Sequence, residues 1–311
     1  MNMEDRDLTD STLDPWLKSH LIDEDQDLLL SKVESPRRRF LKRMIRQKAA
    51  LVAFGVIIVL FLVAALSKWV SPHDPDLQDL ERIFSKSNQS NLLGTDELGR
   101  DVLSRLISGG RVSLQAGLQA TLIALLIAVP VGLISGFFGG KTDRVIMIFN
   151  DAIMSLPALI FAVALIGVIG AGLTKSMFAV GFVFAPRLVR LVRGSVIGVK
   201  EETFVEASLS IGSGTSRILW RHILPNIFSP LIIASSLMAG RAMLAEASLS
   251  FIGLGVQSPQ ASWGSMLSRA FRERTEAPIL MLYPGALIAV TVLALNTLGD
   301  GIRDSIGRDI R

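Results

Sequence analysis

The sequence predicts an all-α membrane protein with six transmembrane helices. Half of the 311 residues are hydrophobic and 19% are charged, whereas a soluble domain usually carries about 25% charged residues. The mean hydropathy is +0.47. A membrane span needs roughly 20 apolar residues to cross about 30 Å of hydrocarbon. Four stretches without any charge are near or above that length: 49–67, 112–140, 152–174 and 277–299.

The N-terminal segment differs in composition from the rest. Residues 1–36 contain ten acidic and three basic residues and no apolar core, so we do not expect a signal peptide. We expect 1–41 to be an acidic cytoplasmic tail with a basic flank. Residues 42–311 are expected to form the six-helix transmembrane domain.

Two further spans carry charges. In the fourth, three arginines lie three residues apart and follow a short apolar run, at 187, 190 and 193. Their long stems can lie along apolar surface while their heads reach the interface. The fifth is interrupted by Arg241 and Glu246. The six predicted spans lie near 48–69, 112–138, 147–170, 175–197, 227–250 and 278–299.

The distribution of basic residues predicts the orientation. With six spans, both termini lie on one side of the membrane. On that side, the segments 37–48, 139–144, 187–224 and 301–311 carry 18 Lys and Arg residues, and the opposite side carries ten. Basic residues favour the cytoplasm, so both termini and the stretch 200–225 are predicted to be cytoplasmic. The loops at 70–110 and 251–277 are predicted to face outward.

The first outer loop ends in "TDELGRDVLSRLI". Thr95 is a candidate N-cap, and Asp96 and Glu97 suit the first turn of a helix. The sequence therefore predicts a short helix over 96–107, lying along the outer surface of the membrane. Its apolar residues, which should face lipid or protein, are Leu98, Val102, Leu103, Leu106 and Ile107.

A polar insert, "FVEASLSIGSGTSRILWRHILPN", lies between the fourth and fifth spans. Helical spacing predicts a short helix over 200–210. Its apolar face would consist of Phe204, Ala207 or Ser208, and Ile211. Gly212 and Gly214 should break this helix, since glycine permits left-handed backbone.

A second short helix is expected over 215–224, ending before Pro225 because proline disfavours helix in the preceding residue. An apolar face on a short helix needs a partner surface. That surface could be the chain's own membrane helices, the lipid headgroups or another protein.

The spacing within this insert resembles the EAA motif of ATP-binding-cassette (ABC) importer permeases. Ser208 takes the third position of the motif, and His222 stands where the pattern has isoleucine, as in the "RHILPN" form of the peptide-transporter branch. The resemblance implies a type I ABC importer permease fold in which this element couples to a separate ATPase. The residues to which it assigns that role are Glu206, Ala207, Gly212, Arg221, His222, Leu224 and Pro225.

Three other stretches resemble the same family over about 42–311: "LLGTDELGRDVLSRLISGGRVSL", "EASLSFIGLGVQSPQASWGSML" and "NTLGDGIRDSIG". The chain is most similar to the C-type subunit of dipeptide and oligopeptide importers, and glutathione and nickel importers share these motifs. The resemblance implies a homologous second permease, ATPase subunits inside and an extracytoplasmic substrate-binding protein outside. No cofactor is expected in this chain, since ATP and Mg²⁺ would be bound by the ATPase subunits.

Ionisable residues inside spans are expensive and indicate function. Arg241, Glu246 and Asp151 are therefore candidates for the translocation path. Arg241 lies nearest the predicted midplane and could favour the carboxylate of a peptide, or could form an ion pair with the second permease. Arg241 and Glu246 are five positions apart, about 140° around a helix, which is a poor geometry for pairing.

Two glycine patterns have simpler interpretations. "GGKT" at 139–142 lacks the first glycine of a phosphate-binding loop, because Ser135 stands there, and an apolar helix precedes it. We expect a tight cytoplasmic turn. Gly132, Gly136 and Gly140 are spaced by four, which indicates close packing between helices.

Other functional classes fit less well. The chain has no cysteine and three widely separated histidines, so no metal site is expected. An intramembrane hydrolase needs a nucleophile with a base, but no histidine lies inside a span, and the acids at 151 and 246 have no evident partner. A passive channel is the third possibility. The basic residues flank apolar spans, which indicates contact with membrane lipid and not with nucleic acid. We therefore expect a transport subunit, not an enzyme, and no catalytic residues.

Overall fold

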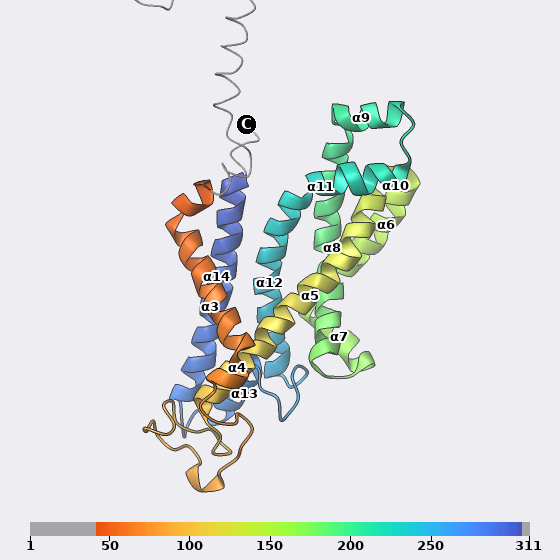
Figure 1. The fold of residues 1–311 in the computed structure, drawn as a ribbon. Coiled ribbons are helices and arrows are strands. Elements are labelled where there is room, and N and C mark those ends of the chain that lie inside the picture. The colour runs from red at the N-terminus through yellow and green to blue at the C-terminus, as the bar shows by residue number, and fades with distance from the viewer. Residues whose placement is uncertain (1–41, 307–311) are drawn as a thin grey trace, which may run out of the picture. The chain divides into compact units, whose positions relative to one another are not determined.

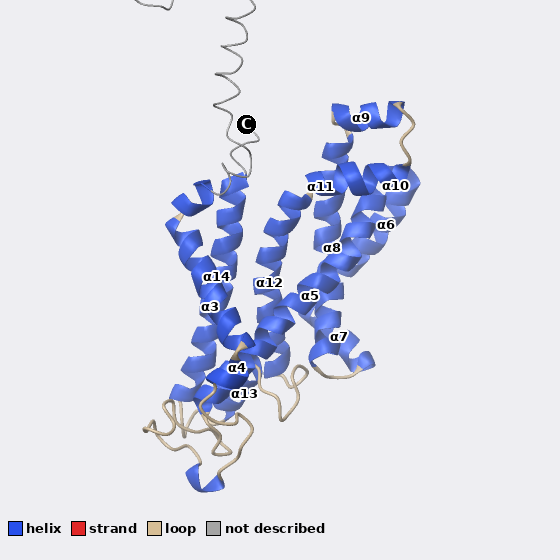
Figure 2. Cartoon of the chain, viewed as in Figure 1, coloured by secondary structure: helices blue, strands red, loops and turns tan. Residues whose placement is uncertain are grey.

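The computed structural model describes residues 42–306. The predicted tail over 1–41 and the last five residues lie outside this part of the chain. Residues 42–46 are helical; the description below concerns 47–306. Figure 2 shows helices joined by loops, and no strand occurs among the described residues. The all-helical prediction is confirmed.

The predicted spans correspond in order to six helical regions. Within residues 42–306, four helices are long and apolar enough to cross a membrane, and a bent pair, α6 with α7, would make a fifth. The remaining region, α8, has 28 residues and includes the arginines at 187, 190 and 193. The regions are α3 (Lys48–Ala65), α5 (Val102–Phe138), α6 (Gly140–Met154) with α7 (Ala158–Ile169), α8 (Leu173–Lys200), α12 (Phe228–Phe251) and α14 (Ile279–Ile306).

The third span is bent where a continuous helix was predicted over 147–170. α6 and α7 meet at 92°. Pro157 occupies the N-cap of α7 with φ −58° and ψ 121°, outside the helical region, and proline disfavours helix in the residue before it. The break therefore follows from the local sequence.

The predicted surface helix over 96–107 is wrong. Residues before Val102 form turns, and α5 continues without a break for 37 residues. The N-cap is Asp101, whose carboxylate accepts from the Ser104 amide. Thr95 instead accepts a hydrogen bond from the Ser85 amide at 2.9 Å. The cap thus lies six residues later than predicted, and the six residues before α5 fold back as a loop.

Close packing of α5 against α8 forms the centre of the bundle. Four alanines of α5, spaced by four, are completely buried: Ala116, Ala120, Ala124 and Ala128. A Cβ added at Gly132 would lie 2.6 Å from Val192 Cβ, and one at Gly136 would lie 2.7 Å from Val196 Cβ. Small residues let helix backbones approach closely. The packing prediction is confirmed for these two glycines and is wrong for Gly140, which has open space around it.

The helices are arranged so that the chain returns to its starting end. Figure 1 shows α3 and α14 side by side, with α5 crossing the bundle diagonally toward α6 and α8. The Gln47 side chain donates to the Ser305 hydroxyl at 3.4 Å, which joins the start of α3 to the end of α14. The short helices α4 (Ser67–Val70) and α13 (Trp263–Arg272) lie at the other end.

Candidate functional site

The insert between α8 and α12 forms a helix–turn–helix at the end of the bundle where α3 begins and α14 ends (Figure 1). It contains α9 (Thr203–Ser210), α10 (Thr215–Arg217), a π-helical segment η2 (Ile218–Ile223) and α11 (Leu224–Asn226). Gly212 separates α9 from α10 with φ +75°, and a Cβ there would meet no atom within 4 Å. Glycine is therefore required by the left-handed backbone and not by crowding.

The second helix does not end before Pro225, as predicted, but stays helical to Asn226. A proline clashes with the carbonyl four residues earlier in a regular α-helix. Here the preceding six residues form a π-helix, which has a wider turn. The wider turn accommodates the proline and lets the insert join α12 almost directly.

One face of the insert is anchored to the membrane helices. Val205, Ile218 and Ile223 are completely buried. They pack with residues from the ends of α5, α8 and α12: Leu133, Phe137, Val192, Val196 and Leu231. Burying such side chains contributes about 1.5–3 kcal/mol each. The insert is therefore fixed to the bundle and would move with it.

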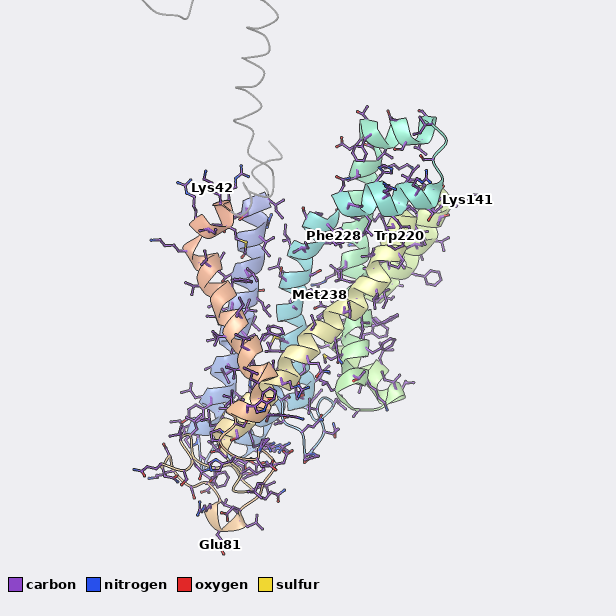
Figure 3. The ribbon with its side chains drawn as sticks, viewed as in Figure 1. Lys42, Glu81, Lys141, Trp220, Phe228 and Met238 are labelled. Atoms are coloured by element: carbon purple, nitrogen blue, oxygen red, sulfur yellow. The ribbon has the colours of Figure 1, made fainter. Side chains whose placement is uncertain are left out.

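The opposite face is apolar and exposed. Ile211 is 82% exposed, Trp220 57% and Phe204 42%. Ala207 is also exposed, so the predicted face of Phe204, Ala207 and Ile211 points away from the chain, and Val205 with Ser208 forms the inward face. Figure 3 labels Trp220 on the second helix of the insert, in segment η2. Exposed apolar patches of this kind mark surfaces for binding other proteins or membranes.

The polar residues assigned to the insert are accessible. Glu206, Gly212, Arg221 and Pro225 are exposed, and His222 and Leu224 are half-buried. Within residues 42–306, the Glu206 carboxylate makes no ion pair; the backbone amide donates to the Glu202 carbonyl at 3.3 Å, and the backbone carbonyl accepts from the Ser210 hydroxyl at 2.9 Å. Its carboxylate is available to a group outside this chain.

Ionic and hydrogen-bonding contacts connect α5, α6 and α8 beside the insert. Arg193 donates from Nε to Asp143 Oδ1 at 2.5 Å and from Nη2 to Oδ2 at 2.6 Å. The Ser135 hydroxyl also donates to Asp143, at 2.5 Å. Lys200 Nζ donates to the Phe137 carbonyl at 2.7 Å, near the end of α5. This network was not predicted from the sequence, although Arg193 was noted as a charge at a span's end.

The residues predicted for the translocation path lie in three different environments. Glu246 is 1% exposed and accepts a hydrogen bond from the Ser250 hydroxyl at 2.6 Å. Asp151 is exposed and pairs with Arg190 at 2.6 Å. The expectation that these acids have no partner is therefore wrong. Glu246 pairs with Ser250, one turn further along α12, and Asp151 pairs with Arg190 of α8. The structure does not bring the three predicted residues together.

Arg241 lines a cavity of about 180 Å³ between α8 and α12, and Arg187 lines the same cavity. Both side chains are exposed, and neither forms an ion pair within the described part of the chain. The remaining lining is apolar and includes Phe184, Leu188 and Met238. Arg187 was expected at an interface, and its position beside Arg241 was not predicted from the sequence.

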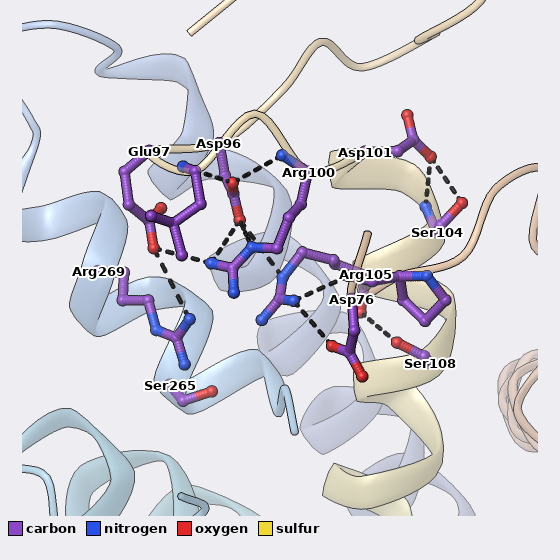
Figure 4. A network of polar contacts seen from close by, with 12 residues as sticks. Asp76, Asp96, Glu97, Arg100, Asp101, Ser104, Arg105, Ser108, Ser265 and Arg269 are labelled. Atoms are coloured by element: carbon purple, nitrogen blue, oxygen red, sulfur yellow. Dashed lines mark hydrogen bonds and ion pairs between the residues drawn. The ribbon is translucent and has the colours of Figure 1, made fainter. Parts of the chain in front are cut away.

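The end of the bundle opposite the insert carries a buried ionic network (Figure 4). Arg100 donates to Asp96 at 2.8 Å and to Glu97 at 2.9 Å. Arg105 donates to Asp76 at 3.2 Å, and its Nε lies 3.4 Å from Asp96 Oδ2. Both arginine side chains are almost completely buried. These contacts hold the 71–101 segment against the start of α5.

Comparisons with known proteins agree with this arrangement. The profile of the family "Binding-protein-dependent transport system inner membrane component" matches residues 128–311, and that of the "N-terminal TM domain of oligopeptide transport permease C" matches 35–90. The glutathione transport system permease protein GsiD of Pectobacterium atrosepticum is 36% identical over 275 residues, 88% of this chain and 91% of the relative. GsiD of Salmonella typhimurium is 37% identical over 281 residues, 90% and 93% of the two chains.

Two solved structures of the MetNI methionine ABC transporter, both inward-facing, share the fold. The selenomethionine-soak form has a TM-score of 0.53 at 20% identity, covering 66% of this chain and 96% of that one. The native crystal form has a TM-score of 0.54 at 18% identity, covering 65% and 97%.

Proposed function

The chain belongs to the family of binding-protein-dependent transport system inner membrane components, and we propose that it forms half of the pathway of an importer for short peptides, glutathione first among them. The resemblance to ABC importer permeases and the type I importer fold are confirmed. The chain is a multi-pass permease subunit of the bacterial inner membrane. It is a transport subunit and not itself an enzyme.

The substrate proposal rests on the function for which the relatives are named. Glutathione is a tripeptide with one γ-linked amide, so its transport requires recognition of amide and carboxylate groups, which short peptides also carry. The relatives favour glutathione over nickel as the cargo of this chain.

We propose that the helix–turn–helix over 203–226 docks on a separate ABC ATPase subunit. The observation that carries this is the exposed apolar face of Phe204, Ile211 and Trp220 on an element whose other face is anchored in the bundle. A docked ATPase would cover this face, and the anchored side would transmit its motion to α5, α8 and α12. ATP and Mg²⁺ would be bound by the ATPase in the cytoplasm, so we propose that this end of the bundle faces the cytoplasm and that both termini lie on that side.

A second, homologous permease would complete the pathway, since a polar substrate needs a water-lined cavity that excludes lipid. An extracytoplasmic binding protein would deliver substrate at the opposite end. Nucleotide binding would then favour one access state over the other. Within this scheme Arg241 and Arg187 would line the route.

The test is reconstitution of the complex purified through a tag on this chain, with its binding protein. ATP-dependent accumulation of glutathione or a tripeptide in vesicles is the expected result. A complex that contains an ATPase but accumulates neither compound would contradict the substrate proposal. Purification without an ATPase or a second permease would contradict the proposed assembly.

A further inference from the structure

A cavity of about 840 Å³ opens at the end of the bundle opposite the helix–turn–helix. It is bounded by α4, the first turns of α5, the turn between α7 and α8, and the loop around 260. Figure 1 shows α4 and the α7–α8 turn at this end. Pockets that hold small-molecule ligands measure about 300–1,000 Å³, so this cavity has the size of a ligand site.

Three basic side chains from three different helices line the cavity: Lys68 of α4, Arg111 of α5 and Lys175 of α8. All three are exposed, and none of them forms an ion pair with another residue in the described range 42–306. Like charges repel, so gathering three of them around one space is unfavourable unless an anion enters it.

The single acidic residue in the lining, within the same range, is Asp76. Its carboxylate accepts from Arg105 at 3.2 Å, and Arg105 is buried in the ionic network of Figure 4. Asp76 therefore pairs with Arg105 and not with Lys68, Arg111 or Lys175. The wall as a whole stays positive, which concentrates small anions at its mouth.

Uncharged polar groups complete the wall. Gln115, Thr174 and Gln260 line the cavity, and their side chains make no hydrogen bond to other described residues. Amide and hydroxyl groups can both donate and accept. They suit the backbone amides of a peptide, while the three cations suit its carboxylates.

We propose that this cavity is a first binding site for small peptide-like anions with more than one carboxylate, held by Lys68, Arg111 and Lys175. The proposal rests on the function proposed above and specifies where the substrate first contacts this subunit. It also assigns a preference: at equal size, a ligand with two carboxylates binds more tightly than the same ligand with its carboxylates esterified.

The absence of cysteine from the chain allows a direct test. Ala171 lines the cavity in the α7–α8 turn and is exposed, so Ala171→Cys provides one thiol there. The tagged complex carrying this substitution is placed in nanodiscs of neutral phosphatidylcholine. Rates of modification by an anionic and a cationic methanethiosulfonate of similar size are then compared.

We expect the anionic reagent to be favoured, and the ratio of the two rates to fall about 10-fold when Lys68, Arg111 and Lys175 are all changed to Gln. The control is Lys86→Gln, which removes an exposed charge from the loop before α5 that does not line the cavity. An unchanged ratio in the triple variant, or an equal fall in the control, would overturn the proposal.

Ligand protection identifies the anion. S-methylglutathione, which has two carboxylates and no thiol, should slow modification of the Ala171→Cys complex, and its dimethyl ester should not. The triple Gln variant should lose this protection. If S-methylglutathione fails to protect, or protects the triple variant equally, the site is not a peptide-anion site.

Two other partners offer similar chemistry. Protection by phosphatidylglycerol in the nanodisc without protection by S-methylglutathione would assign the cavity to a lipid headgroup. Loss of binding-protein capture in the triple variant, with ligand protection intact, would assign it to protein docking. Either result overturns the proposal. ATP-driven uptake by the wild-type complex is measured in parallel, so a failure of the proposed function is seen separately from a failure of this site.

Discussion

Arg193 and Asp143 form a two-point ion pair between α8 and α6, with both hydrogen bonds at 2.5–2.6 Å. The pair lies beside the helix–turn–helix, and Asp143 also accepts from Ser135 of α5. Three helices of the bundle are thus joined at one carboxylate. Motion of the helix–turn–helix would reach α8 and α5 through this point as well as through the buried apolar contacts.

Asp143→Asn should therefore destabilise the subunit more than Asp151→Asn. Asp143 and Arg193 are 17% and 30% exposed, whereas Asp151 and Arg190 are 61% and 53% exposed. We expect a loss of about 1–2 kcal/mol for the first change and about 0–1 kcal/mol for the second. Thermal unfolding of the purified complex measures both. Equal melting temperatures would contradict the assigned role.

Close contact between α5 and α8 predicts the effect of adding one methyl group. Gly132→Ala would push against Val192 and should cost about 1–3 kcal/mol. Gly194→Ala, in α8 with nothing within 4 Å, is the matched control. The yield of folded protein and the melting temperature should fall in the first variant alone. Val192→Ala combined with Gly132→Ala should recover part of the loss.

The orientation of the chain in the membrane can be tested by introducing one cysteine at a time, since the natural sequence contains no cysteine that would react as well. Ile211 and Leu77 are exposed at opposite ends of the bundle, at 82% and 65%. In intact spheroplasts, Leu77→Cys should react with a membrane-impermeant reagent, and Ile211→Cys should react only after lysis. External labelling at 211 would reverse the proposed topology, including the cytoplasmic placement of both termini.

Arg241 and Arg187 should affect transport when their charge is removed. Arg241→Gln keeps a polar side chain, and we expect a several-fold fall in uptake of glutathione with normal assembly of the complex. Arg187→Gln should act in the same direction. The control is Arg190→Gln, which removes a charge from the same helix that pairs with Asp151 and does not line this cavity.

The two interpretations of Arg241 give different results in that experiment. If Arg241→Gln causes the two permeases to separate, Arg241 forms an ion pair with the second permease and does not line the route. If Arg241→Cys is inaccessible to water-soluble reagents in every nucleotide state, the cavity does not face the route.

The sequence predicted the helices well because each span needs an uncharged apolar run, a property that the sequence shows directly. The positions where helices begin or break were harder to predict from the sequence. Pro157 lies inside an uncharged stretch, so hydropathy alone treated α6 and α7 as one span. Thr95 was a plausible N-cap by residue type, but Asp101 takes this role because the preceding loop folds onto α5.

Contacts between segments that are distant in the chain could not be predicted from the sequence. Lys68, Arg111 and Lys175 come from three helices, and nothing in their spacing indicates a shared cavity. Arg187 and Arg241 also come from different helices, and only the folded bundle places them in the lining of one cavity. By contrast, the positions of the helix–turn–helix residues followed from a local pattern, because a motif within one element keeps its spacing in the fold.

The most direct test of the central claim is ATPase capture by Glu206→Arg. Glu206 is exposed and unpaired within residues 42–306, so its replacement should leave membrane insertion intact while opposing ATPase docking. Glu276→Arg makes the same charge change in an exposed loop at the opposite end. We predict that the tagged Glu206→Arg chain retains at most about a tenth of the ATPase co-purified by wild type, a difference of about 1.4 kcal/mol, and that the Glu276→Arg chain retains all of it. Full ATPase recovery with normal substrate-stimulated hydrolysis in Glu206→Arg would contradict the account.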